Sequence, residues 1–226
     1  MNNYKKRLQQ HARTLPLALA IAAAGFNGAA IAAENGKFRI GVVTFLSGPA
    51  AGPFGEPSAN AAKVLVEGLN QGKLPAPYDK LGINGAEIEM VMIDEAGGAA
   101  KQVEEFRNLV QRQKVDAVVG YISSGDCLAI APVAEELGAM TVFYDCGTSQ
   151  LFSEDKTPQF VFRTSLDAAV DNIGAARYLA KTRPDATRVG GIQQNYAWGQ
   201  DSWSDFTLSM AQVMPKAQVV ESQMPK

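Results

Sequence analysis

Two adjacent serines, Ser123 and Ser124, follow an apolar run and precede a helical pattern. A serine at this position can cap the helix, because its hydroxyl accepts a hydrogen bond from a free backbone N–H group. The positive end of the same helix can also hold a ligand carboxylate. The two roles are compatible if one serine caps the helix while its neighbour binds the ligand.

Three aromatic residues lie in predicted loops where they could contact a ligand. Phe54 lies in the Gly- and Pro-rich loop 46–56, where it could cover an apolar part of a ligand or pack against the next helix. Tyr196 and Trp198 lie in segment 195–201, and large aromatic side chains are costly to expose without a use. Both suit a ligand clamp, because they combine apolar area with a polar group, although core packing of one of them is an equal alternative.

The rest of the chain offers little for catalysis. The only histidine, His11, lies in an N-terminal segment that we expect to be removed, which excludes Ser-His-Asp and Cys-His catalysis and most zinc sites. The segment 120–125 is not a G-x-S-x-G nucleophile elbow, and loop 46–56 lacks both G-x-G-x-x-G and the lysine of a P-loop. We therefore expect no catalytic residue, no metal and no cofactor.

The N-terminus has the three-part pattern of a secretory signal peptide. Basic residues at positions 5, 6, 7 and 13 precede an apolar run over 15–24, and small residues lead to Ala32 and Ala33, after one of which we predict cleavage. The apolar run is too short for a membrane anchor, which needs about 20 residues. No cysteine near this site offers lipid attachment. We therefore predict a signal peptide at 1–33 and a mature protein that is free in solution.

Removal of the signal peptide makes the chain more acidic. Residues 1–33 contain four basic and no acidic residues, so the formal net charge changes from −2 to −6. Nucleic-acid binding needs clustered positive charge. A mildly acidic chain with dispersed charges therefore argues against nucleic acid as a partner.

The two cysteines, Cys127 and Cys146, allow two interpretations. In an oxidising compartment an even pair indicates a disulfide. Two buried free thiols are the alternative, because sequence alone does not give the distance between the residues.

From residue 38 onward, short apolar runs alternate with longer stretches of helical period. This alternation predicts an α/β fold with parallel strands that helices cover on both faces. A stop for the third helix is expected at Gly138. The predicted strands are 38–44, 88–93, 116–120, 141–144, 159–163, 189–192 and 218–220, and the predicted helix faces lie within 62–69, 99–110, 130–137, 169–180 and 203–210.

A polar interruption at about 145–163 indicates a crossover between two lobes. In open parallel sheets, ligands bind beyond the carboxyl ends of the strands, in the loops that lead into helices. The loops expected to form the site are therefore 46–56, 122–126, 145–149 and 195–200. They are rich in small, hydroxyl-bearing and aromatic residues, which suits holding a small molecule better than transforming it.

Several motifs resemble those of one protein family, and they occur in this order: Phe38–Pro49, Ile93–Ala96, Val118–Gly120 with Ile122–Gly125, Ala131–Glu136 and Val161–Thr164. Together they are similar to the branched-chain-amino-acid (Leu/Ile/Val) type of ABC-transporter solute-binding protein, from about residue 37 to the end. The resemblance implies a type I periplasmic binding fold in the periplasm, in which two lobes close on a ligand and deliver it to an ABC permease in the inner membrane.

The resemblance implies roles for individual residues. Ser124 matches the family serine that holds the ligand carboxylate, Phe54 matches an aromatic residue in the first loop, and Trp198 matches an aromatic residue of the second lobe. The neighbouring Ser123 and Tyr196 complete these parts of the predicted ligand site.

The segment 145–148 departs from the family pattern. Asp145 and Gly147 fall where the family has small residues and a threonine that grip the ligand head group, and Thr148, one place later, could replace that threonine. Residues 144–148 together with residues 195–200 look more like the subgroup associated with aromatic carboxylates. The expected ligand is a small carboxylate, which leaves branched-chain amino acids, other amino acids and aromatic acids open.

The resemblance also sets expectations about organisation. It implies a first α/β lobe at 34–162 and the beginning of an incomplete second lobe at 163–226, in a monomeric protein without enzymatic activity. The family's acidic partner for a ligand amine would lie beyond Lys226, so we expect a fragment or a truncated product that binds weakly. Two alternatives are the ligand-binding domain of a sensor or receptor and an exported hydrolase that works without histidine.

Overall fold

The computed structural model describes residues 36–153 and 157–225, which belong to one compact unit of the chain, Asn35–Lys226. The predicted signal peptide, residues 1–33, lies outside the described residues. Within the described part, no helix is both long and apolar enough to cross a membrane.

The first sheet consists of five parallel strands in the order β2-β1-β3-β4-β5. Their bounds agree closely with the strands that the apolar runs predict, which confirms the α/β fold. Parallel strands buried on both faces favour β-branched and other apolar residues, which explains why the apolar runs located them. The strands are β1 (Lys37–Thr44), β2 (Glu87–Asp94), β3 (Ala117–Gly120), β4 (Thr141–Phe143) and β5 (Val161–Arg163).

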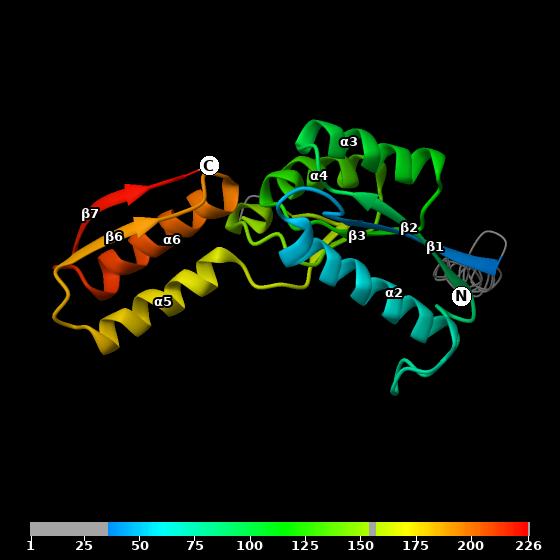
Figure 1. Cartoon of the computed structure of the whole chain (residues 1–226), viewed down its shortest axis with the longest axis horizontal. Coiled ribbons are helices and arrows are strands. Elements are labelled where there is room, and N and C mark those ends of the chain that lie inside the picture. The colour runs from blue at the N-terminus through cyan, green and yellow to red at the C-terminus, as the bar shows by residue number, and fades with distance from the viewer. Residues whose placement is uncertain (1–35, 154–156, 226) are drawn as a thin grey trace, which may run out of the picture. The chain divides into compact units, whose positions relative to one another are not determined.

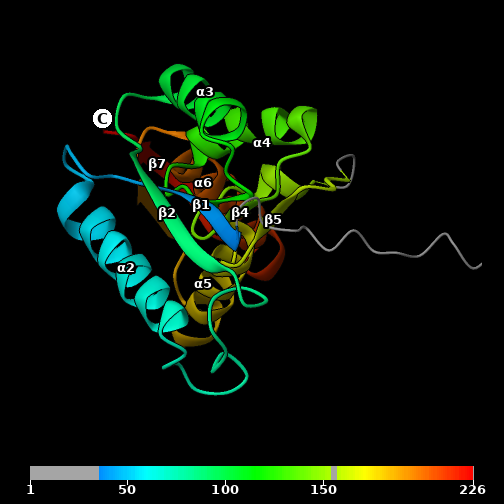
Figure 2. The same cartoon turned by 90° about the vertical axis from the view of Figure 1, so that its right-hand side faces the viewer.

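Helices cover both faces of this sheet, as Figures 1 and 2 show, with α2 (Glu56–Asn70) on one face and α3 (Ala99–Arg107) and α4 (Ser124–Leu137) on the other. The predicted helix at 99–110 is divided, because α3 continues as a wider helical turn over Asn108–Arg112. Gly138 ends α4 as predicted. Its φ of 61° is a left-handed conformation that glycine adopts without steric cost.

The loop predicted at 46–56 is partly helical. Residues Ala51–Gly55 form a π-helical turn that leads directly into α2. The glycines and prolines of this segment suggested an irregular loop, whereas Pro57 at the start of α2 is compatible with a helix, because the first helical N–H groups have no partner within the helix.

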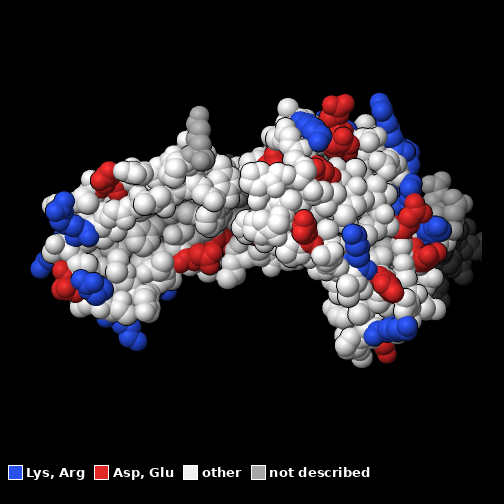
Figure 3. Space-filling model, in the orientation of Figure 1, with Lys and Arg blue, Asp and Glu red and all other residues white. Residues whose placement is uncertain are grey.

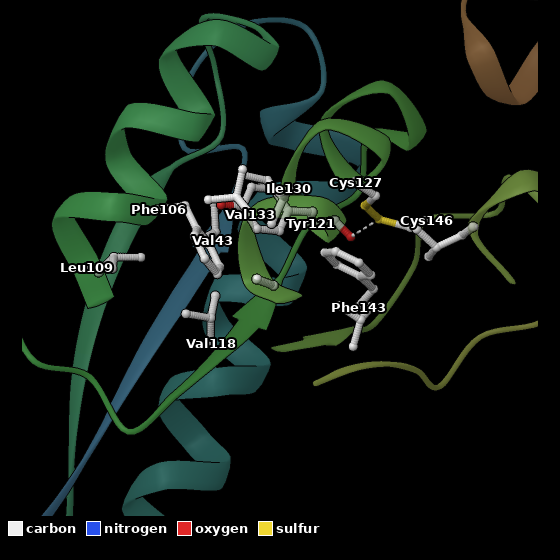
Figure 4. Close-up of a cluster of buried hydrophobic side chains, with 13 residues drawn as sticks. Val43, Phe106, Leu109, Val118, Tyr121, Cys127, Ile130, Val133, Phe143 and Cys146 are labelled. Carbon is white, nitrogen blue, oxygen red and sulfur yellow. Dashed lines mark hydrogen bonds between the residues drawn. A yellow bond between two sulfur atoms is a disulfide. The ribbon is translucent and has the colours of Figure 1, made fainter. Parts of the chain in front are cut away.

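The main apolar core lies between the first sheet and helices α3 and α4 (Figure 4). Val43 and Val118 of the sheet pack with Phe106 of α3, and all three side chains are fully buried. Tyr121 and Phe143 meet edge to face, with ring centroids 5.9 Å apart and an interplanar angle of 70°. This core supports the loops that follow β3 and β4.

A disulfide joins Cys127 of α4 to Cys146, which follows β4, and the Cα atoms lie 6.3 Å apart (Figure 4). Both cysteines are fully buried. The bond therefore connects the first turns of α4 to the loop after β4 across the top of the core.

A second sheet pairs β6 (Arg188–Ile192) with β7 (Gln218–Gln223) in parallel. Helices α5 (Ala168–Thr182) and α6 (Ala197–Val213) pack against each other beside it, and Met210 and Met214 are buried in this second core. The run 159–163 contains β5, which belongs to the first sheet, so the chain passes from the first sheet to α5 over residues 164–167. The lobe bounds 34–162 and 163–226 stay a prediction.

Helix α6 begins earlier than the sequence pattern indicates. We expected a loop at 195–200 and a helix near Trp203, whereas Tyr196 is the N-cap residue and Trp198 lies in the first turn of α6. The N-cap makes no side-chain hydrogen bond to the helix, so no capping signal marks this start in the sequence.

On the face drawn in Figure 3, acidic and basic residues are interspersed over the surface. This agrees with the dispersed charge expected from the sequence.

We predict that the Cys127→Ala, Cys146→Ala double variant loses about 3 kcal/mol of unfolding free energy, because the disulfide constrains the unfolded chain across a separation of 19 residues. Urea denaturation of the full chain measures this loss, and mass spectrometry without reductant checks the bond. Reductant should destabilise the wild type and leave the double variant unchanged. Equal stabilities of the oxidised wild type and the double variant would contradict the prediction.

Candidate functional site

A pocket of about 380 Å³ lies where the loops after several strands meet. Six of the eight predicted ligand-binding residues line it together: Phe54, Ser124, Asp145, Gly147, Tyr196 and Trp198. They come from the turn before α2, the start of α4, the loop after β4 and the start of α6. The rule that ligands bind beyond the carboxyl ends of parallel strands therefore identified the loops that form this pocket. We call it the carboxyl-end rule.

The two adjacent serines differ in their surroundings. Ser123 is the N-cap of α4, and its hydroxyl oxygen accepts a hydrogen bond of 3.3 Å from the backbone N–H of Asp126. Ser123 does not line the pocket, which differs from the expectation that it contacts the ligand. Ser124 lines the pocket, is 1% exposed, and its Oγ has no hydrogen-bond partner among the described residues.

Thr148 also lies outside the pocket lining, in contrast to the expectation. It is fully buried, its hydroxyl bonds with the carboxylate of Asp201 in α6, and its Oγ1 accepts a hydrogen bond from the N–H of Gln150. These bonds engage the hydroxyl of Thr148 and hold the loop after β4 in place, and its contact with a ligand stays a prediction.

Arg163 further holds this loop. Its guanidinium donates to the carbonyl oxygens of Cys146, at 3.0 Å, and Thr148, at 2.7 Å. It also pairs with Asp167 at 3.0 Å, with only 9% of its own side chain exposed. The charge of Arg163 is thus engaged by these partners, and Arg163 does not line the pocket.

Aromatic side chains form one wall of the pocket. The rings of Tyr196 and Trp198 lie 6.4 Å apart at an interplanar angle of 34°. The Trp198 ring lies so close to Gly147 that a Cβ atom at position 147 would be 2.6 Å from the indole Nε1. A larger residue at position 147 would therefore require the indole ring to move. Phe54 is 53% exposed, so it lines the pocket without being packed into the core.

Four residues of the lining were not predicted: Ile122, Leu166, Asp171 and Gln194. Ile122 and Gln194 lie within or beside segments that the sequence singled out, but neither has a side chain typical of a site. Leu166 and Asp171 lie near and in the first turn of α5, where the apolar stripe indicated a helix and nothing indicated a pocket.

The carboxylate of Glu95 holds the loop before Ser124 in place. The sequence alone assigned Glu95 no role in the site. Glu95 is fully buried and accepts hydrogen bonds from the backbone N–H groups of Ile122, at 2.9 and 3.0 Å, and Ser123, at 2.7 Å. The preceding Tyr121 has a φ of 70°, a left-handed conformation that costs a residue other than glycine about 1–3 kcal/mol. The bonds to Glu95 and the packing of Tyr121 together support this turn.

Several acidic groups close to the pocket have raised pKa values. Burial raises the pKa of Glu95 to about 7, against the lowering effect of its backbone hydrogen bonds, and the carboxylates of Asp126 and Asp145 add to the rise. Burial also raises the pKa of both aspartates. Burial raises the pKa of Tyr196, and Asp145 and Glu95 raise it further. Burial is thus the largest cause of each of these shifts.

We predict that Glu95→Gln reduces the pH dependence of stability. Between its ordinary pKa of 4.5 and its folded pKa of about 7, Glu95 keeps a proton in the folded protein that the unfolded chain releases. The unfolding free energy of the wild type should therefore fall as pH rises through this window, and that fall should shrink in the variant. Urea denaturation at pH 5 and pH 8 measures both.

The matched control is Glu104→Gln, which removes an exposed carboxylate of α3. It should keep the pH dependence of the wild type. An identical pH dependence in Glu95→Gln and the wild type would show that Glu95 does not titrate in this window.

Solved structures similar to this fold include solute-binding proteins of ABC transporters. A solute-binding protein from R. palustris in complex with benzoate is 23% identical, has a TM-score of 0.70, and the match covers 84% of this chain and 48% of that one. A branched-chain amino acid transporter substrate-binding protein from Streptococcus pneumoniae in complex with isoleucine is 22% identical, with a TM-score of 0.69 and coverage of 84% and 49%. A periplasmic binding protein from Burkholderia mallei is 20% identical, with a TM-score of 0.72 and coverage of 85% and 47%.

At these identities the likeness shows the fold, and the chain spans about half the length of each of these proteins. No curated protein sequence matches the chain. Residues 37–225 match the family described as periplasmic binding protein, a range that includes both sheets and every residue of the pocket. The chain belongs to the periplasmic binding protein family.

Proposed function

We propose that this chain is part of the periplasmic solute-binding component of an ABC importer, and that it captures a small carboxylate in the pocket. The observation that carries the proposal is the hydroxyl of Ser124, which is buried, lacks a partner among the described residues and lines the pocket at the start of α4. A buried hydroxyl left without a hydrogen bond costs about 1–3 kcal/mol, and a ligand oxygen would remove this cost.

The backbone around Ser124 supports an anion as the bound group. The first N–H groups of a helix have no partner within the helix and favour negative charge. In α4 the N–H of Asp126 bonds to Ser123, and the preceding N–H groups of Ile122 and Ser123 bond to Glu95. A carboxylate beside Ser124 would therefore use the hydroxyl and the N–H groups of Ser124 and Gly125.

The ligands named for similar solved structures support a carboxylate and leave the rest of the molecule open. Benzoate, 4-hydroxybenzoate and isoleucine share a carboxylate group and little else. Aromatic acids and amino acids both stay candidates for this chain.

Binding without turnover is the activity that the lining supports. The pocket combines one serine, two aspartates and a glutamine with apolar and aromatic residues, and contains no histidine or cysteine that could act as a base or nucleophile. In the proposed function the protein is exported by the signal peptide at 1–33. It then acts as a monomer, with lobes at 34–162 and 163–226, and passes its ligand to an inner-membrane permease.

We predict that Ser124→Ala weakens binding of a carboxylate ligand about tenfold, because it removes one hydrogen bond to a charged group. Isothermal titration of the full chain with benzoate and with isoleucine measures the effect. Benzamide is the matched probe for benzoate, and it should bind more weakly because it lacks the charge.

The matched control is Ser123→Ala. It should lower the unfolding free energy by about 1 kcal/mol, through loss of the helix cap, and change affinity less than Ser124→Ala does. Equal affinity of the wild type and Ser124→Ala for the carboxylate would refute the assigned role of Ser124.

A further inference from the structure

The loop after β4, residues 145–148, is bonded along its whole backbone to one neighbouring segment. Each of its four carbonyl oxygens accepts a hydrogen bond from the segment 163–168, which runs from the end of β5 to the start of α5. The position of the loop is therefore tied to the stretch by which the chain leaves the first sheet. The donors are Ser165 to Asp145 at 2.7 Å, Arg163 to Cys146 at 3.0 Å and to Thr148 at 2.7 Å, and the N–H of Ala168 to Gly147 at 2.7 Å.

The disulfide ties the same loop to a different part of the pocket. Ser124 is the first residue of α4, and Cys127 lies three residues later, on the same side of the helix. Cys127 is bonded to Cys146, which lies between two lining residues of the loop. The Sγ atom of Cys146 also lies 3.4 Å from the carbonyl oxygen of Tyr121. Figure 4 shows this bond between the helix and the loop.

Hydrogen bonds do not provide this second connection. Within residues 36–153 and 157–225, no hydrogen bond joins the loop 145–148 to a residue of α4. The covalent bond is therefore what links the loop directly to the helix that presents Ser124. The loop in turn supports the aromatic wall, because the indole ring of Trp198 rests against Gly147.

A disulfide limits how far its two cysteines can separate. It keeps their Cα atoms within about 7 Å of each other, and here they lie 6.3 Å apart. Two thiols or two alanine side chains impose no such limit, so the loop would then follow the segment 163–168 alone. Movement of that kind would separate Asp145, Gly147 and Trp198 from Ser124, although all four residues line one pocket.

We propose that the Cys127–Cys146 disulfide is a positioning element of the pocket and that ligand affinity depends on it. The bond keeps the loop 145–148 at the distance from Ser124 at which one ligand contacts both. The proposal rests on the proposed function, because it concerns the arrangement of the pocket that holds the ligand. It goes beyond a contribution to stability, because it expects weaker binding from a reduced protein that is still folded.

The binding test is isothermal titration of the full chain, oxidised and reduced, with benzoate and with isoleucine. Dithiothreitol supplies two electrons and two protons, so that the S–S bond breaks, two thiols form and the dithiol becomes a cyclic disulfide. If the binding arrangement is then populated about a tenth of the time, Kd rises about tenfold. The Cys127→Ala, Cys146→Ala variant should bind as weakly as the reduced wild type, with or without dithiothreitol.

All forms must be folded for these affinities to be compared. Sucrose in every sample favours the folded state, and far-UV circular dichroism verifies it. The matched control is Leu109→Ala, which keeps the disulfide and removes a fully buried side chain of the main core that does not line the pocket. Its cavity lowers stability, so it should bind the probes as the oxidised wild type does.

A second measurement needs no ligand. The chain contains two tryptophans, and Trp203 stacks on Phe206 without lining the pocket. In a Trp203→Phe background, the bimolecular rate constant for acrylamide quenching of Trp198 should be higher after reduction, because the loop that supports the indole ring is released. Fluorescence lifetimes give this constant separately from any quenching by the disulfide itself. Leu109→Ala in the same background should leave it unchanged.

The outcomes separate the two proposals. Equal affinity of the folded oxidised and reduced forms overturns the inference and leaves the proposed function standing. Equally weak binding by Leu109→Ala, or a reduced form that is unfolded in sucrose, also overturns it, because the bond would then serve stability alone. If the oxidised wild type binds neither probe, the proposed function fails. In that case faster quenching of Trp198 after reduction still supports the positioning of the loop, and unchanged quenching overturns it.

Discussion

The buried carboxylate of Glu95 is the group on which the geometry of the pocket depends. It accepts hydrogen bonds from the backbone N–H groups of Ile122 and Ser123 and so determines the direction in which the chain enters α4. The left-handed turn at Tyr121 is maintained because this residue is also packed against Phe143. Ser123 is then placed as a helix cap and Ser124 faces the pocket. The hydrogen bonds to Glu95 thus help to place two adjacent serines so that Ser123 caps α4 and Ser124 lines the pocket.

The loop after β4 is held by a different set of interactions. The disulfide ties Cys146 to the first turns of α4, and Arg163 binds the carbonyl oxygens on either side of Gly147. Trp198 lies against Gly147, and Thr148 bonds to Asp201 of α6. Thr148 and Trp198 link this loop to α6, so loops and helices that follow strands of both sheets contribute to a single pocket.

These interactions concentrate acidic groups at the carboxyl ends of the strands. Glu95 is needed for the turn, and Asp126 lies in the first turn of α4, where the helix dipole favours a negative charge. Asp145 adds a third carboxylate whose charge no salt bridge in the described structure compensates. Keeping such groups close together costs stability unless protonation or a bound cation reduces the repulsion.

The sequence by itself determined the strands, most helices, the parallel direction of the strands and the loops that form the pocket, because apolar periodicity and the carboxyl-end rule are local signals. The order of the strands in the first sheet came from the structure. Six of the eight candidate residues followed from those loops. Only the tertiary structure decided that Ser123 caps while Ser124 faces the pocket, that Thr148 bonds to Asp201, and that α6 begins at Ala197. The roles of Glu95 and Asp171 were also decided there. The bonds of Glu95 to Ile122 and Ser123 and of Thr148 to Asp201 join residues far apart in the chain, and such contacts leave no periodic pattern in the sequence.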